Sequence, residues 1–322
     1  MLSVYLARRV TPQVVDALEA SFELTVHDSE WPPARAEVLA RSAGKDGLLV
    51  MTNDLVDDEL LDAAGPQLRV VANHGVGFDN VDLAAATRRG VVVTNTPGVL
   101  TGATGELTLA LVLDLLRRVT EGDRFLRRRT PWIWSPTFML ATGLAGRTVG
   151  IVGLGRIGRE VARLVEAFGM RVVYASPSAK DVAYPRLGLE QLLETVDVVS
   201  LHCPLTPETR HLIGAAALGT MRRDAFLVNT TRGPIVDEAA LVDALREGEI
   251  AGAALDVYER EPGVHPGLLE LENVVLAPHL GSGTTETREA MGMLCVEALR
   301  AVLLEDRCPE NALNPEAWGA RV

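Results

Sequence analysis

Short apolar runs alternate with segments of helical periodicity along this chain. In the first hundred residues, strand-like runs are expected at 2–7, 22–27, 47–51, 68–72 and 90–94. A helix opening at Thr11 and Pro12 places Val14, Val15 and Leu18 on one face, and further helices are expected at 32–43 and 55–63. This βα alternation predicts a parallel sheet with helices on both faces.

A second βα series follows in the later part of the chain. Its strands are expected at 149–152, 171–175, 197–201, 225–229, 251–256 and 274–277. One long helix over 106–129 precedes this series. A final helix, capped by Thr284 and running to about residue 304, could return to the first domain.

Composition narrows the class of protein. A length of 322 residues suffices for two domains, and the net charge of −12 with no basic stripe argues against a nucleic-acid partner. Three widely spaced cysteines without a C-x-x-C pair predict neither a disulfide framework nor a metal site, and they fit a reducing cytoplasm. We expect no signal peptide and no membrane span.

The chain's strongest single motif is glycine-rich. Gly153, Gly155 and Gly158 form a G-x-G-x-x-G pattern between a strand and a helix, with Arg156 and Ile157 inside it. The first glycine permits a tight turn, the second lets a pyrophosphate approach the backbone, and the third lets helix and strand pack closely. A nicotinamide or flavin dinucleotide is therefore expected at this helix N-terminus.

Three polar residues follow later strands. Arg232, Glu261 and His279 each lie just past an apolar run, where an open α/β sheet places its ligands. Taken singly, a surface ion-pair partner, a solvated acid and a turn histidine are the favoured interpretations of Arg232, Glu261 and His279. Together they suit reduction of a 2-keto acid, with arginine holding the carboxylate, histidine as general acid and glutamate stabilising the imidazolium.

Six motifs in order give the chain a family resemblance. They are G-V-G-F-D-N-V-D at 75–82, V-G-L-G-R-I-G at 152–158, H-C-P-L-T at 202–206, N-T-T-R-G at 229–233, D-V-Y-E-R-E-P at 256–262 and P-H-L-G-S at 278–282. With these motifs the sequence resembles the D-2-hydroxyacid dehydrogenase family across essentially its whole length. It looks most like the glyoxylate/hydroxypyruvate reductase branch.

The resemblance implies an α/β fold of two doubly wound parallel-sheet domains. A flavodoxin-like substrate domain would comprise 1–100 and 286–322, and a Rossmann NAD(P)-binding domain would be inserted at 101–285. Arg232, Glu261 and His279 would be catalytic. Val76 and Gly77, together with Arg232, would bind the substrate carboxylate, and Phe138 matches an aromatic residue that reaches into the neighbouring subunit's site.

A further set of residues matches the family's cofactor-binding positions. The resemblance places at the cofactor Thr104, Gly153, Gly155, Arg156, Ile157, Gly158, Ser176, Cys203, Pro204, Thr230, Thr231, Asp256, His279 and Gly281. NAD-binding turns usually carry an acid about 20 residues after the glycines, to accept from the ribose 2′-OH. Here no acid occurs between Glu166 and Asp181, and Ser176 stands in its place. We therefore expect NADPH to be preferred over NADH, with NADH still used.

Other functions and assemblies stay open. Phosphite oxidation is an alternative within the family, although that branch has a lysine at the position of Val76. A nucleotide-sensing scaffold like the C-terminal-binding corepressors is a more distant alternative. A homodimer is expected around the helix at 106–129, because Leu107, Leu111 and Leu115 line one face and Leu109, Val112 and Leu116 another. Burial of both faces within one chain is the competing interpretation.

Overall fold

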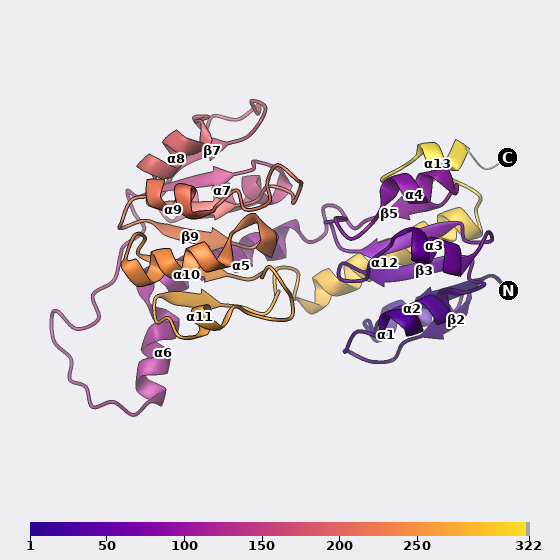
Figure 1. Ribbon diagram of the computed structural model, residues 1–322, viewed down its shortest axis with the longest axis horizontal. Coiled ribbons are helices and arrows are strands. Elements are labelled where there is room, and N and C mark those ends of the chain that lie inside the picture. The colour runs from indigo at the N-terminus through magenta and orange to yellow at the C-terminus, as the bar shows by residue number, and fades with distance from the viewer. Residues whose placement is uncertain (320–322) are drawn as a thin grey trace. The chain divides into compact units, whose positions relative to one another are not determined.

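The computed structural model describes residues 1–319, and its chain divides into two compact units (Figure 1). Unit 1 comprises Met1–Leu100 and the part of the chain from Gly283 onward, and unit 2 comprises Thr101–Ser282. The chain thus leaves unit 1 after residue 100 and re-enters it at 283, whereas re-entry was expected at 286. Residues 320–322 of the expected C-terminal part lie outside the described residues.

Unit 1 is built on a five-stranded parallel sheet in the order β2-β1-β3-β4-β5, the flavodoxin order. Its strands are β1 (Ser3–Leu6), β2 (Glu23–Val26), β3 (Gly47–Met51), β4 (Val70–His74) and β5 (Val92–Thr94). One face packs against α1 (Pro12–Glu19) and α12 (Thr285–Leu303). The other packs against α2 (Arg35–Ser42), α3 (Asp58–Ala64) and α4 (Leu83–Arg88). A short α13 (Glu316–Gly319) contacts α4.

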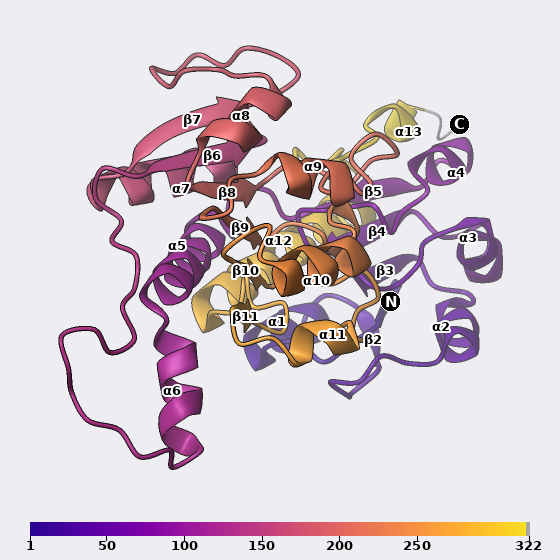
Figure 2. The same cartoon turned by 60° about the vertical axis from the view of Figure 1, so that its left-hand side comes forward.

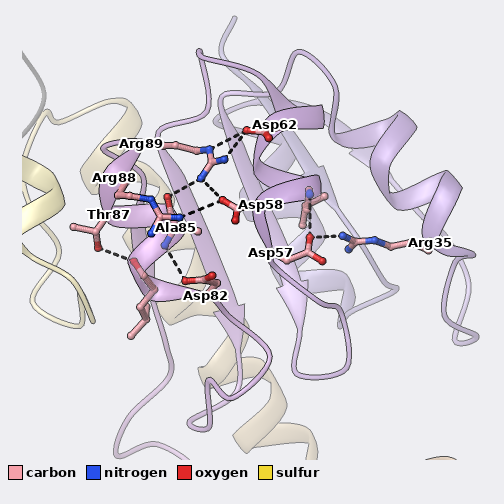
Figure 3. A network of polar contacts seen from close by, with 11 residues as sticks. Arg35, Asp57, Asp58, Asp62, Asp82, Ala85, Thr87, Arg88 and Arg89 are labelled. Carbon is pink, nitrogen blue, oxygen red and sulfur yellow. Dashed lines mark hydrogen bonds and ion pairs between the residues drawn. The ribbon is translucent and has the colours of Figure 1, made fainter.

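Helices α3 and α4, on either side of β4 in the chain, are fixed by polar contacts (Figure 3). The carboxylate of Asp57 caps α3 by accepting from Leu60 N at 3.0 Å, and that of Asp82 caps α4 by accepting from Ala85 N at 2.8 Å. Such caps contribute about 1 kcal/mol each. Arg89 then links the two helices, because its guanidinium donates to both Asp58 and Asp62.

Unit 2 is built on a six-stranded parallel sheet in the order β11-β10-β9-β8-β6-β7. Its strands are β6 (Thr148–Val152), β7 (Arg171–Ala175), β8 (Val198–Leu201), β9 (Phe226–Asn229), β10 (Gly252–Leu255) and β11 (Val274–Leu276). A single bridge between Tyr174 and Arg186 adds a rudimentary strand outside β7. With that bridge, the strands follow the 3-2-1-4-5-6 order of a Rossmann fold, extended by one strand.

Helices cover both faces of the unit 2 sheet. Helices α5 (Thr101–Arg117) and α7 (Arg156–Ala167) pack on one face. The other face packs against α8 (Leu189–Thr195), α9 (Ala215–Thr220), α10 (Glu238–Glu247) and α11 (Pro266–Leu269). The expected parallel, doubly wound architecture is therefore confirmed for both sheets.

The prediction of a single helix at 106–129 is wrong. The structure has α5 from Thr101, a break at Arg118 with φ 57°, and a separate α6 (Val119–Arg127). Asp114 causes the new start, because its carboxylate accepts from the backbone N–H of Thr120 at 2.6 Å and from the hydroxyl of the same residue. The Arg118 guanidinium turns outward to Glu121 and to the carbonyl of Leu140.

Two other expected helices in unit 1 begin later than predicted. The one expected at 32–43 starts at Arg35, and the one expected at 55–63 starts at Asp58. In the second case Val56 is held in a bridge to Val81, since its N–H donates to Asn80 O at 2.8 Å. An extended residue in a bridge cannot at the same time begin a helix.

Candidate active site

The glycine-rich turn between β6 and α7 forms a cradle for an anion. Gly153 has φ 95°, and a Cβ there would lie 2.5 Å from Cys203 N. A Cβ at Gly158 would lie 2.4 Å from Gly153 O, so helix and strand touch at that point. At Gly155 a Cβ would enter open space, and this residue is the N-cap of α7. The open side of Gly155 and the N–H groups of the first turn suit a pyrophosphate.

Glu261 and His279 are in direct contact. His279 Nδ1 lies 2.7 Å from Glu261 Oε2, and Tyr258 N donates to Glu261 Oε1 at 3.1 Å. Burial raises the pKa of the Glu261 carboxyl, but the hydrogen bond and charge of His279, the Tyr258 N–H and the charge of Arg232 outweigh it, so the pKa lies below its usual value. Glu261 is therefore an anion at neutral pH, facing the imidazole.

Arg232 lies just past β9 and belongs to the same cluster. Asn229 Nδ2 donates to the carbonyl of Arg232 at 2.9 Å, and Arg232 Nη1 donates to Thr231 O at 2.9 Å. Its charge acts on the carboxyl of Glu261. The structure therefore brings Arg232, Glu261 and His279 together from three separate strand ends.

Asp256 fixes the backbone that carries His279. The N–H of His279 donates to Asp256 O at 2.8 Å, and the Asp256 carboxylate accepts from Leu280 N at 2.6 Å and Gly281 N at 2.8 Å. These three bonds hold His279 at φ 55°, a left-handed conformation that is uncommon outside glycine. Burial raises the pKa of the Asp256 carboxyl, and the two N–H donors act against that rise.

Several of the residues expected at the cofactor contact one another. A Cβ at Gly281 would lie 3.6 Å from Thr104 Oγ1 and 3.3 Å from Asp256 Oδ2, so these three residues are neighbours. Thr108 Oγ1 donates to Thr104 O at 2.8 Å and lies 2.9 Å from Thr230 Oγ1. Past the end of β9, Thr231 Oγ1 donates to Cys203 O, past the end of β8, at 2.9 Å. Pro204 is the next residue in the chain after Cys203. Among residues 1–319, no group of side chains is arranged to hold a metal ion.

In unit 1, three consecutive carbonyls of the loop after β4 accept hydrogen bonds from buried residues. Gly75 O accepts from Thr96 N at 3.0 Å. Val76 O accepts from Asn95 Nδ2 at 2.8 Å, and Gly77 O accepts from Asn73 Nδ2 at 2.8 Å. A peptide unit whose C=O points inward directs the N–H of the next residue the opposite way. The N–H groups of Val76, Gly77 and Phe78 therefore point away from these buried partners.

Comparison with known proteins agrees with this geometry. The model of the family "D-isomer specific 2-hydroxyacid dehydrogenase, NAD binding domain" matches residues 109–281, all within unit 2. A glyoxylate reductase from Aeropyrum pernix is 48% identical, over 99% of this chain and 97% of that protein, and one from Korarchaeum cryptofilum is 45% identical, over 99% and 97%. The chain belongs to the D-isomer specific 2-hydroxyacid dehydrogenase family.

Solved structures place this dehydrogenase in the same branch. A crystal structure of an NADPH-dependent glyoxylate/hydroxypyruvate reductase from Sinorhizobium meliloti, in complex with NADP and malonate, matches with a TM-score of 0.87 and 35% identity over 98% of each chain. A protein from Thermus thermophilus matches with a TM-score of 0.92 and 47% identity over 97% of this chain and 100% of that one. The chain is thus an oxidoreductase of the glyoxylate reductase branch, with a nicotinamide dinucleotide as cofactor.

Not every expected site residue of the dehydrogenase joins the cluster. Phe138 lies in the segment after α6, which projects from the body of unit 2 in both views (Figures 1 and 2). Its ring contacts Phe125 edge-on, with centroids 5.6 Å apart, and stacks on Trp132 at 5.8 Å. Neither neighbour belongs to the cluster of Arg232, Glu261 and His279.

Three residues of this dehydrogenase were missed in the sequence. Asn73 and Asn95 orient the loop after β4, and Arg186 contacts the residues that follow β7. Asn95 directly follows β5, and Asn73 comes directly after the apolar run expected at 68–72 although it lies within β4, so their position was a usable signal. Arg186 offered none, because ten residues separate it from its partner Ser176.

Proposed function

We propose that this dehydrogenase reduces glyoxylate or hydroxypyruvate to the corresponding D-2-hydroxy acid, with NADPH preferred and NADH also used. The observation that carries the proposal is the 2.7 Å contact of His279 with the anionic Glu261, beside Arg232 and at the edge of a dinucleotide fold. The relatives named glyoxylate reductase support the same substrate class.

The three residues of the cluster take separate roles in this proposal. A dinucleotide whose pyrophosphate is held at the glycine-rich turn would supply, from its reduced nicotinamide, the hydride for the carbonyl carbon. His279 Nδ1 is engaged by Glu261, so Nε2 donates the proton to the carbonyl oxygen. Glu261 stabilises the imidazolium before that transfer. Arg232 holds the substrate carboxylate and orients its carbonyl.

The loop after β4 takes a binding role. We assign the N–H groups of Val76 and Gly77 to the carboxylate of the keto acid, as donors that need no side-chain charge. The three inward carbonyl contacts of this loop support the assignment, because they fix the direction of its N–H groups.

The preference for NADPH rests on the end of β7. Ser176 follows the strand directly, where an acid that would repel a 2′-phosphate is usual in NAD-binding turns. Either cofactor would make the same contacts with the glycine-rich turn. We propose these contacts for Gly153, Gly155, Arg156, Ile157 and Gly158.

We also propose a homodimer in the cytoplasm. Helix α5 buries Leu111, Val112, Leu115 and Leu116 within its own unit, so that helix alone does not require a partner. Helix α6 has no buried residue, and the segment after it exposes Trp132, Ile133 and Trp134 by 56%, 81% and 74%. A second copy covering this segment would bring Phe138 toward the partner's site. The three free cysteines fit a reducing compartment.

A panel of keto acids assayed with each reduced cofactor tests the function. We expect kcat/KM to be highest for glyoxylate or hydroxypyruvate with NADPH, and hydroxypyruvate to give D-glycerate. A chain that binds the dinucleotide but turns over none of these acids would instead be a nucleotide-sensing scaffold. Oxidation of phosphite with NAD would favour the other alternative within the family.

A further inference from the structure

The connection between β7 and α8 folds back along the edge of the unit 2 sheet. Tyr174 N donates to Pro185 O at 3.0 Å, and Leu187 N donates to Tyr174 O at 2.9 Å. Arg186 therefore stands opposite Tyr174, one residue before the end of β7. Figure 2 shows this connection as a long loop beyond β7.

The Arg186 side chain reaches back over the residues that follow the strand. Its Nε donates to Ser176 O at 3.0 Å and its Nη2 donates to Pro177 O at 2.8 Å. A guanidinium has five N–H donors, so these two bonds fix the group and leave three N–H donors, both on Nη1 and one on Nη2, for another acceptor. The side chain is exposed, so a ligand can reach it.

The connection that carries Arg186 also contains Lys180, Asp181 and three residues with hydroxyl groups, Ser176, Ser178 and Tyr184. Lys180 Nζ lies 3.1 Å from Ser178 Oγ, and its backbone N–H donates to the Tyr174 hydroxyl at 2.8 Å. Arg159, from the first turns of α7, donates to Asp181 O at 3.3 Å and ties the loop to the helix that follows the glycine-rich turn. The chain from residue 167 to 180 contains no acid.

We propose that Arg186 binds the 2′-phosphate of NADPH and is the main determinant of the cofactor preference. The inference rests on the proposed function, in which Ser176 stands at the ribose. In this fold the 2′ substituent lies at the end of the second strand, which is β7 here. The guanidinium is held at that strand end before the cofactor arrives, so little side-chain freedom remains to be lost on binding.

Binding of two small ligands tests the inference without turnover. Adenosine 2′,5′-bisphosphate and 5′-AMP differ only in the 2′-phosphate, and calorimetry measures the affinity of each. The variants are Arg186→Gln and, as a control for net charge, Arg171→Gln, because Arg171 is also exposed but begins β7 at its opposite end. Glutamine keeps a donor for the loop carbonyls and loses the charge.

We expect Arg186→Gln to weaken the bisphosphate on the order of tenfold, the loss of one charge-assisted contact at an exposed site, and to leave 5′-AMP unchanged. Arg171→Gln should alter neither affinity. High salt should lower the wild-type preference for the bisphosphate and have less effect in Arg186→Gln.

Each contrary result has a separate meaning. If the wild type binds both ligands equally, the NADPH preference itself is wrong, and this inference fails with it. If the wild type prefers the bisphosphate and Arg186→Gln keeps that preference, the NADPH proposal stands and Arg186 is excluded. If Arg186→Gln weakens both ligands equally, Arg186 only holds the loop together, which also overturns the inference.

Discussion

At the scale of single residues, the contact between Glu261 and His279 predicts a pH effect. Glu261 is an anion because its pKa lies below the usual value, so it favours the protonated imidazole. In Glu261→Gln that charge is absent, and the proton donor faces a neutral amide. The basic limb of kcat/KM for keto-acid reduction should then move to lower pH. Initial rates across the pH range measure the shift, and an unmoved limb would remove Glu261 from this role.

Some site residues can be predicted from the sequence alone, and others cannot. Arg232, Glu261 and His279 each follow an apolar strand, so the sheet edge brings them together without knowledge of any contact. Arg186 is different. Its position depends on a loop that returns to the edge of β7, and nothing in the local sequence pattern specifies that return.

At the scale of elements, the loop after β4 yields a second prediction. Asn95→Ala removes the donor to Val76 O, which releases the peptide between Val76 and Gly77. We expect the KM for glyoxylate to rise roughly fivefold to tenfold, the cost of one hydrogen bond, while NADPH affinity stays unchanged. Asn311→Ala is the matched control, since Asn311 donates to the carbonyl of Asn95 and not to the loop. Equal KM values in wild type and Asn95→Ala would contradict the assignment of this loop.

Helix α6 and the segment after it give the third prediction. If a second copy covers the exposed tryptophans, the protein should be a dimer by light scattering at micromolar concentration. Trp134→Glu should shift it toward monomer, because a charge in an apolar contact costs several kcal/mol. Trp31→Glu, at an equally exposed tryptophan of unit 1, should leave the dimer intact. A wild-type monomer at that concentration would contradict the proposed dimer.

Hydrophobic periodicity does not predict the boundary between α5 and α6. Apolar residues continue at helical spacing past Arg118, so the pattern alone predicts one helix. The break depends on Asp114, whose carboxylate accepts from the N–H of Thr120 in the first turn of α6. A side chain that bonds to backbone six residues later changes the boundary without changing the hydrophobic pattern.

At the scale of the whole molecule, His74 makes stability depend on pH. Burial, and then the charge of Arg288, lowers the pKa of His74 from 6.5 to about 4. Below pH 6.5 His74 becomes protonated in the unfolded chain, whereas in the folded chain it stays neutral down to about pH 4. The free energy of unfolding therefore decreases as the pH is lowered through this window. The loss is about 1.4 kcal/mol per pH unit.

Urea unfolding at several pH values measures this loss. Above about pH 5 most carboxylates stay charged, so histidines dominate the change. His74→Gln should reduce the fall in the free energy of unfolding between neutral pH and pH 5. An unchanged fall would show that His74 is not held neutral in the folded protein.

The overall architecture was the most predictable level. Regular alternation of strands and helices specifies parallel sheets covered on both faces, and both sheets have that form. Strand order followed only from the resemblance, because hydrophobic pattern does not encode which strands are neighbours. The bridge at Tyr174 and Arg186 is too short to leave any periodic signal.

Replacement of His279 by alanine tests the central claim most directly. The account predicts that kcat for glyoxylate reduction falls by roughly 10²–10⁴-fold, the range for a positioned general acid, while NADPH affinity is kept. Single-turnover rates with saturating NADPH separate the chemical step from product release. Near-normal turnover by His279→Ala would contradict the mechanism, whatever the substrate proves to be.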